Sequence, residues 1–74
     1  MARTVYRITV GEKIKDFRDK CEMSQSSFGK MLGVSPQAVC KWEMGVSYPD
    51  IILLPVIAEI LGCTIDEFFM PITK

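Results

Sequence analysis

Histidine is absent from this sequence, and so are closely spaced cysteines. The 74 residues hold nine basic and nine acidic side chains, three cysteines and no histidine. Histidine is the commonest general base and metal ligand. The sequence also shows no plausible pair of a nucleophile and a base. We therefore expect no enzyme, no cofactor and no metal site. The cysteines at positions 21, 40 and 63 form no CxxC pair, so we interpret them as reduced thiols, with Cys21 and Cys63 as small core residues.

Long hydrophobic runs are also lacking. The longest apolar stretch covers residues 51–58 and includes Pro55, whereas a helix that spans a bilayer needs roughly 20 apolar residues. At the start of the chain, Arg3, Arg7 and several threonines interrupt the apolar residues, which is not the pattern of a secretory signal. We therefore expect a protein with no membrane partner that works in the cytoplasm.

A net charge of one sign is the third missing feature, but the charges are unevenly placed. Residues 1–44 hold eight basic and five acidic side chains, whereas residues 45–74 hold one basic and four acidic ones. A neutral total therefore does not exclude an anionic partner on the basic half. Hydrophobic residues make up 49% of the chain, which is a large share for one domain with so small a core. We expect part of this apolar material to contact a second subunit.

Helix-start residues recur along residues 10–74 and predict an all-α domain of five helices. Thr9 with Glu12 and Thr64 with Glu67 fit the capping-box pattern, in which each side chain satisfies a free backbone donor of the other residue. Single N-caps and glycine stops mark the remaining helices. The predicted helices cover about residues 10–22, 25–32, 36–44, 50–61 and 65–69, with N-caps at Ser24, Ser35 and Asp50 and stops at Gly33, Gly45 and Gly62.

The spacing of apolar residues indicates which faces of these helices are buried. In the first three helices the expected core residues are Val10, Ile14, Phe17, Cys21, Phe28, Met31, Leu32, Ala38, Val39 and Trp42. The fourth helix is expected to begin with a distorted or 3-10 turn around Pro55. It is apolar on every side, through Ile51, Ile52, Leu53, Val56, Ile57, Ala58, Ile60 and Leu61. A helix that is apolar all round is buried all round, which again indicates a subunit interface.

The prefix TVYRITV is the one segment that favours a strand. Its valine, threonine, tyrosine and isoleucine have high strand propensity, and Tyr6, Ile8 and Val10 alternate with more polar residues. An all-helical chain offers such a strand no partner. Residues 1–9 are therefore predicted to be a frayed N-terminal arm, or a strand that pairs with the same segment of another copy.

The second and third helices are short and are joined by a tight turn through Gly33 and Val34, which is a helix-turn-helix arrangement. Gly29 has no side chain, so the third helix can cross close to the second. Val34 and Val39 are expected to fix the crossing angle from below. The N-terminal end of the third helix then stands out from the domain, and a helix about 10–12 Å across fits a DNA major groove.

The run MSQSSFGKMLGVSPQAVCKWEMGVSYPD, followed by LLPVIAEILGCTIDEFF, resembles the Cro- and phage-repressor-like (XRE) helix-turn-helix family. The resemblance covers about residues 10–69 and is strongest to the variant common in Gram-positive bacteria whose third helix reads like PQAVSKWE. It implies a five-helix, lambda-repressor-like domain over residues 10–74. Such a domain binds double-stranded DNA and regulates transcription as a homodimer on a two-fold operator, with the recognition helix, about residues 36–44, in the major groove.

The resemblance also assigns roles to single residues. The positions that meet base edges are Pro36, Gln37 and Lys41. Those that contact the DNA backbone are Gln25, Ser35, Lys30 and Tyr48, and Gln25 also braces the recognition helix. Arg18 and Glu43 match an internal salt bridge between the first helix and the end of the third. The dimer contacts are expected at Ile60, Phe68, Phe69 and Met70, although the apolar pattern suits the three C-terminal residues equally well to the core.

Elementary chemistry agrees with the base-reading positions. Glutamine can bond adenine N6 and N7 together, and lysine can reach guanine O6 and N7. Gln37 and Lys41 are four residues apart and share one helix face, although lysine reaches phosphate as readily as a base. The chain departs from the family in three places, since Pro36 replaces a polar reader, Gly29 replaces the usual alanine and Cys40 replaces a serine.

A second kind of function remains open. The same fold serves as a protein-interaction module, or as the antitoxin of a toxin–antitoxin pair, and the neutral charge with few phosphate-binding lysines favours such a partner. The polar pair Gln37 and Lys41 favours DNA instead, because a purely protein-binding version has no reason to keep polar residues at the groove-facing positions.

Overall fold

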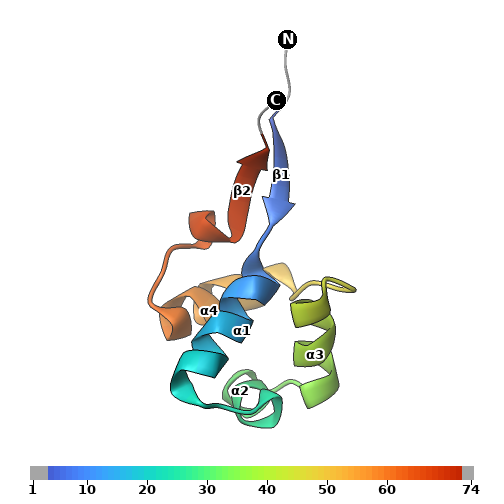
Figure 1. Cartoon of the computed structure of the whole chain (residues 1–74), viewed down its shortest axis with the longest axis vertical. Helices are drawn as coiled ribbons and strands as arrows, with labels where there is room; N and C mark the ends of the chain where they lie inside the picture. Colours follow the sequence, from blue (N-terminus) through green and yellow to red (C-terminus); the bar gives the residue numbers. More distant parts are fainter. Residues whose placement is uncertain (1–3, 73–74) are drawn as a thin grey trace.

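The computed structural model describes residues 4–72, which form a helical body with a two-stranded ribbon projecting from it (Figure 1). The ribbon makes the molecule elongated, with extents of 44 × 23 × 22 Å. Within this part of the chain no helix is long and apolar enough to cross a membrane. In chain order the elements are β1 (Val5–Ile8), α1 (Val10–Cys21), α2 (Gln25–Leu32), α3 (Pro36–Met44), the 3-10 helix η1 (Ile51–Leu53), α4 (Leu54–Leu61), the 3-10 helix η2 (Ile65–Phe68) and β2 (Phe69–Ile72).

The hydrophobic core lies where the four α-helices and η2 meet. Its fully buried members, each at most 1% exposed, are Val10, Ile14, Phe28, Val39, Ile57 and Phe68. Trp42 and Ala58 are 6% and 5% exposed. Every α-helix thus places at least one side chain in the core. Because burying such a side chain stabilises a fold by about 1.5–3 kcal/mol, these few residues hold the helices together.

Most helix ends follow the predicted local chemistry. The Ser24 and Ser35 hydroxyls accept hydrogen bonds from the backbone N–H groups of Ser27 and Ala38, at 3.0 and 3.2 Å. The helices α2, α3 and α4 end at glycines in the left-handed conformation, with φ of 73–74°. A 3-10 turn, η1, precedes Pro55 as expected, and the Thr64 backbone N–H donates to the Glu67 carboxylate at 2.7 Å.

Thr9 does not cap α1 in the predicted way. Its side chain makes no capping hydrogen bond to the first turn of α1. Instead its hydroxyl donates to the Glu67 backbone oxygen at 3.0 Å, and its backbone N–H donates to the Phe68 oxygen at 2.7 Å. Thr9 is buried, so its hydroxyl and its backbone N–H have little access to water. These two hydrogen bonds satisfy them instead. They tie the start of α1 to η2, at the base of the ribbon.

The strand predicted near the N-terminus exists, but the expectation that it has no partner within its own chain was wrong. β1 pairs antiparallel with β2, with Val5 opposite Ile72 and Ile8 opposite Phe69. The all-α, five-helix prediction is therefore confirmed only as a mostly helical helix-turn-helix fold, because the expected fifth helix is the 3-10 turn η2 followed by a strand. The first three residues of the predicted N-terminal arm lie outside the described residues.

Two expected core residues are on the surface. Cys21, the last residue of α1, is exposed, and Met31 is 50% exposed. Helical spacing indicates which residues lie on the same face of a helix, but not whether another element covers that part of the face. In α2 the inward positions are occupied by Phe28 and Leu32. Of the two cysteines expected in the core, Cys63 is half-buried against it.

Candidate nucleic-acid interface

The turn between α2 and α3 folds tightly back onto α2 at Gly29. The backbone N–H of Val34 donates to the Gly29 oxygen at 2.9 Å. A Cβ atom on residue 29 would lie 2.6 Å from the Val34 oxygen, which is closer than such atoms approach. A close approach at Gly29 is therefore present, but the connecting turn makes it, not the third helix, which was expected from the sequence to cross there. This contact fixes where α3 begins relative to α2.

A second glycine, which sequence reasoning missed, fixes the other end of α3. A Cβ atom on Gly11 would lie 2.0 Å from the Trp42 backbone oxygen and 3.2 Å from the Glu43 Cα. Gly11 is in the first turn of α1, where a glycine is otherwise unfavourable. A glycine inside a helical pattern is a signal of close backbone approach. Here it allows α1 to touch the backbone of α3 near its C-terminal end.

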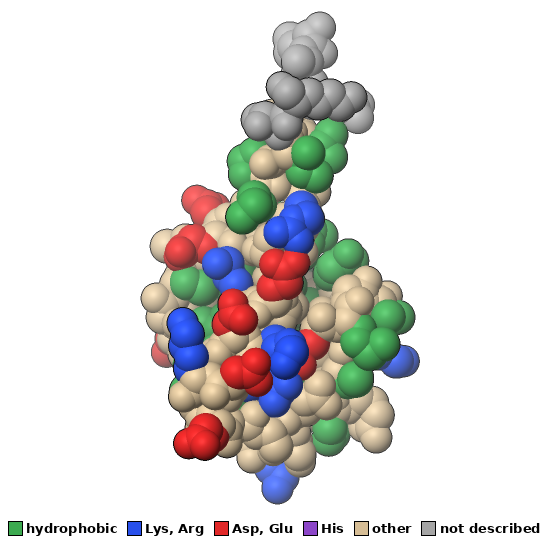
Figure 2. All heavy atoms as spheres, in the orientation of Figure 1, with side chains coloured by type: hydrophobic (Ala, Val, Ile, Leu, Met, Phe, Trp, Pro, Cys, Tyr) green, Lys and Arg blue, Asp and Glu red, His purple; other side chains and the backbone are tan. Residues whose placement is uncertain are grey.

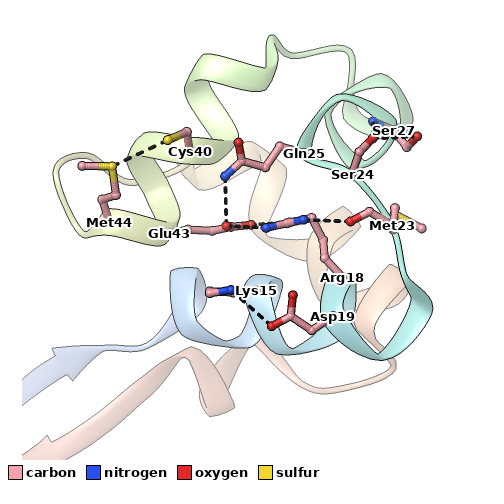
Figure 3. Close-up of polar contacts among 10 residues, drawn as sticks. All are labelled: Lys15, Arg18, Asp19, Met23, Ser24, Gln25, Ser27, Cys40, Glu43 and Met44. Atoms are coloured by element: carbon pink, nitrogen blue, oxygen red, sulfur yellow. Dashed lines mark hydrogen bonds and ion pairs between the residues drawn. The ribbon is translucent and has the colours of Figure 1, made fainter.

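An ion pair under α3 joins it to α1. Arg18 Nε lies 2.6 Å from Glu43 Oε2, and Arg18 Nη2 lies 2.8 Å from Glu43 Oε1 (Figure 3). The two side chains are only 12% and 5% exposed. The third guanidinium nitrogen, Nη1, donates to the Met23 oxygen at 2.7 Å. The predicted partners thus form a two-bond pair, which fixes both the position and the rotation of α3 better than a single contact would.

Gln25 joins the same group of residues, which we call the clamp: Arg18, Glu43 and Gln25. The Gln25 side-chain amide donates to Glu43 Oε1 at 3.1 Å (Figure 3). Burial by itself would raise the pKa of the Glu43 carboxyl, but the hydrogen bonds from Arg18 and Gln25 outweigh it and hold the pKa below its usual value. The bond to Glu43 raises the pKa of Arg18. The clamp is therefore charged at neutral pH and links α1, α2 and α3.

The opposite side of α3 faces solvent and carries the predicted base-reading residues. Val39 and Trp42 point into the core, whereas Pro36, Gln37 and Lys41 are exposed. Within residues 4–72 the ion pairs are Arg7–Glu12, Lys15–Asp19 and Arg18–Glu43, so neither Lys41 nor Lys30 belongs to one. Cys40 is half-buried, and its thiol lies 3.6 Å from the Met44 sulfur.

The residues predicted to contact the DNA backbone surround this face. Ser35 is exposed at the N-cap of α3, Lys30 is exposed in the last turn of α2, and Tyr48 is 54% exposed in the loop after α3. Gln25 is half-buried at the start of α2, and one N–H of its amide is used by Glu43. Its amide carries a second N–H, so bracing α3 leaves Gln25 a donor for a phosphate oxygen.

The predicted dimer residues have unequal access to a partner. Phe68 is fully buried in the core of its own chain, so it offers a second copy no surface. Ile60 and Phe69 are half-buried against the core. Met70 is 51% exposed on β2. Only part of the expected C-terminal contact surface is therefore accessible, and its use by a dimer stays a prediction.

Comparison with known proteins agrees with this geometry. The family described as helix-turn-helix matches residues 14–68, which is most of the chain. The HTH-type transcriptional activator BcrR of Enterococcus faecalis is 36% identical over 56 residues, covering 76% of this chain and 28% of that protein. Repressor protein C2 of Salmonella phage P22 is 35% identical over 57 residues, covering 77% of this chain and 26% of that protein. The chain thus spans about a quarter of the length of these two relatives.

Solved structures give the same result. The P22 c2 repressor protein, in complex with a synthetic operator, matches with a TM-score of 0.72 and 34% identity, over 80% of this chain and 89% of that one. A transcriptional regulator from Listeria innocua shares the fold, with a TM-score of 0.76 at 19% identity over 93% of this chain and 63% of that one. The helices, the clamp and these matches together show that the chain belongs to the Cro- and phage-repressor-like (XRE-type) helix-turn-helix family.

Proposed function

We propose that this protein is a regulator of transcription that binds double-stranded DNA at a specific sequence, with α3 in the major groove. The observation that carries the proposal is the contrast between the two sides of α3. One side of α3 is fixed to α1 and α2 by the clamp. The other side presents Gln37 and Lys41, which are both exposed, and Lys41 belongs to none of the ion pairs within residues 4–72. A reading helix needs both properties, because base contacts have value only when the helix is held in one orientation.

At the base edges, three side chains of α3 would each do different work. Gln37 would bond adenine N6 and N7, and Lys41 would bond guanine or a neighbouring phosphate. Pro36 has no donor, so it would make apolar contact with a thymine methyl group. Each good polar pair discriminates against the wrong base by about 1–3 kcal/mol.

Contacts to the DNA backbone would come from Gln25, Ser35, Lys30 and Tyr48, and from the free backbone N–H groups at the start of α2 and α3. Helix N-termini attract phosphate because their donors and their dipole both favour a negative charge. Few of these groups are cations. We therefore expect a shallow salt dependence, with log K falling by about 2–4 per tenfold rise in salt for a dimer that neutralises two to four phosphates.

A homodimer on a two-fold operator fits this mode of binding. Two copies would place their α3 helices about 34 Å apart, so that they enter successive major grooves on one side of the duplex. A relative in this family has been solved with a synthetic operator, which supports DNA as the target. We expect a protein with such a target to act in the cytoplasm.

The test is selection from a random pool of duplex DNA, followed by sequencing, with three proteins. These are the wild type, Gln37→Ala with Lys41→Ala, and the control Lys20→Ala, which removes one exposed cation from α1. We expect the wild type and the control to enrich the same two-fold motif and the double variant to lose it. If no protein enriches a motif, α3 does not read DNA, and a protein partner becomes the better explanation.

A further inference from the structure

A hollow lies between the ribbon and η2, away from the exposed side of α3. It is lined by Tyr6 of β1, Asp66 of η2, and Phe69 and Pro71 of β2. Its volume is about 550 Å³, which falls within the range of roughly 300–1,000 Å³ that is usual for small-molecule sites. None of its four lining residues has a part in the proposed contacts with DNA, so the hollow is free to take a different ligand.

The ribbon gives this hollow an aromatic wall. Tyr6 lies opposite Pro71, and Phe69 is two residues before Pro71 on the same strand. Because side chains two apart in a strand point to the same side, the rings of Tyr6 and Phe69 are diagonal neighbours on one face of the ribbon. The Phe69 ring is half-buried against the core, whereas Tyr6 is 54% exposed. A small ligand in the hollow can therefore contact both rings.

Asp66 adds a negative charge to this wall. Its side chain is exposed and belongs to none of the ion pairs found within residues 4–72. The neighbouring carboxylate, Glu67, is used differently, since it accepts hydrogen bonds from the Thr64 backbone N–H at 2.7 Å and from the Thr64 hydroxyl at 3.3 Å. The backbone N–H of Phe69 donates to the Asp66 oxygen, which holds Asp66 next to the start of β2. One carboxylate of η2 thus caps the turn, and the other lines the hollow.

The surroundings of the hollow favour a positive charge. Residues 45–74 hold four acidic side chains and one basic one. Arg7, the one charged residue of β1 and β2, lies opposite Met70 on the other face of the ribbon and pairs with Glu12. Figure 2 shows hydrophobic side chains on the ribbon and acidic side chains at its base, on the side where η2 lies in Figure 1. An anion in the hollow would be repelled, whereas a cation would be attracted.

We propose that this hollow binds an organic cation, in the form of an alkylammonium or quaternary ammonium group. The faces of Tyr6 and Phe69 would attract the positive charge through their ring electrons, and the Asp66 carboxylate would attract it directly. The rings and Pro71 would pack against the alkyl groups. A bare metal ion suits the hollow poorly, because such an ion needs several oxygen ligands and one carboxylate lines it. The proposal goes beyond the proposed function and does not depend on it.

The same ammonium group could come from two sources, a free amine or a lysine side chain of another protein. Both would place the charged group beside Asp66 and the rings. A lysine side chain would also bring its backbone against the exposed side chains of the ribbon. Butylammonium reproduces the end of a lysine side chain without that backbone, so its affinity compared with that of a short lysine peptide separates the two sources.

The experiment follows the backbone amide signals of the ¹⁵N-labelled chain by NMR while choline is added at constant ionic strength. The matched ligand is the tert-butyl analogue of choline, which has the same shape and no charge. The proteins are the wild type, Asp66→Asn, Tyr6→Leu and the control Glu59→Gln, which removes an exposed carboxylate of α4 outside the hollow. All three positions are exposed, so folding should survive, and the spectra themselves check it.

We expect choline to bind the wild type with a dissociation constant of about 10 mM, and its neutral analogue to bind roughly tenfold more weakly. The signals that move should be those of Tyr6, Asp66 and Phe69. Asp66→Asn and Tyr6→Leu should each weaken choline binding by about threefold to fivefold, and Glu59→Gln should bind like the wild type. Equal binding of choline and its analogue, or a folded Asp66→Asn that binds choline as the wild type does, would overturn the proposal.

A second series of titrations identifies the source of the cation. It compares butylammonium with a blocked pentapeptide of one lysine and four glycines, and with the same peptide carrying norleucine in place of lysine. A lysine peptide that binds at least about tenfold more tightly than butylammonium would assign the hollow to a protein side chain. Equal or tighter binding of butylammonium would assign it to a free amine. A norleucine peptide that binds as tightly as the lysine peptide would contradict the proposal, because the charge would then have no role.

Discussion

The two ends of this molecule are held to its core by different forces. At the end that carries α3, a nearly buried ion pair and two close backbone approaches fix the helix. At the other end, the ribbon is attached through two hydrogen bonds of Thr9 and the packing of Phe68 and Phe69. Directional contacts hold a helix in one rotation, which suits the reading of bases. Apolar packing specifies direction less strictly, so the ribbon is held in place with less angular precision than α3.

The strongest test of the α3 end is Gly11→Ala. The new methyl group would stand 2.0 Å from the Trp42 backbone oxygen, so α1 and α3 would have to move apart. We expect a loss of about 4 kcal/mol of unfolding free energy, measured by urea denaturation, which in a domain this small removes most of its stability. Ser26→Ala, at an exposed position of α2, is the control and should change stability by less than about 0.5 kcal/mol. A Gly11→Ala protein as stable as the wild type would show that α1 does not fix α3.

Removing one partner of the clamp should have the next largest effect. In Glu43→Ala, the Arg18 guanidinium keeps its charge at a site where it is only 12% exposed. We expect a loss of about 3 kcal/mol of unfolding free energy. The pair of changes Arg18→Met with Glu43→Leu should recover part of that loss, because no unpaired charge remains. If Glu43→Ala costs no more than the exposed change Asp19→Ala, the clamp does not hold α3.

The contacts that hold α3 should be at full strength near neutral pH and should weaken in acid. The pKa of Glu43 lies below its usual value, because the bonds from Arg18 and Gln25 outweigh burial. Its contribution to stability is therefore complete above the unfolded pKa of about 4.3 and is lost as pH falls through the lower folded pKa. In thermal scans, Glu43→Gln should flatten the fall in Tm below about pH 4.5 relative to the wild type. Part of the fall should remain, because the Thr64 backbone bond also lowers the pKa of Glu67. An unchanged acid profile would contradict this account.

Gly29→Ala should have the smallest effect, because two contributions oppose each other. Alanine favours helix α2 by about 1 kcal/mol over glycine. Its methyl group would, however, approach the Val34 oxygen to 2.6 Å, so the turn must shift. We expect a net change within about 1 kcal/mol of the wild-type unfolding free energy, far below that of Gly11→Ala. Equal losses at the two glycines would mean that the turn is as rigid as the α1–α3 contact.

The parts of the fold that sequence predicted depend on signals a few residues apart. The bounds of α2 and α3 follow from serine caps, glycine stops and the proline at the start of α3, all of which act locally. The pairing of Val5 with Ile72 joins residues at opposite ends of the chain, and no local pattern announces it. The role of Gly11 likewise depends on a contact with α3 that the helix pattern of α1 does not contain.

The candidate site likewise has features that were predicted from the sequence and features that were not. The pairing of Arg18 with Glu43 and the exposure of Gln37 and Lys41 agree with what the family resemblance implied. The assignment of Phe68 to a dimer contact did not take account of η2, which turns that side chain into the core. Whether an apolar residue faces its own core or a partner depends on how far the neighbouring elements cover it, which sequence alone does not state.

The central claim is that the exposed side of α3 reads base pairs, and one measurement addresses it most directly. For the operator obtained by selection, the affinities of the wild type and of Gln37→Ala would be measured on duplexes with each of the four base pairs at every position. We predict that Gln37→Ala loses discrimination at one base pair per half-site, by about 1–3 kcal/mol, and keeps it elsewhere. If Gln37→Ala discriminates at every position as the wild type does, or weakens binding equally on all duplexes, α3 does not read bases through Gln37 and the account fails.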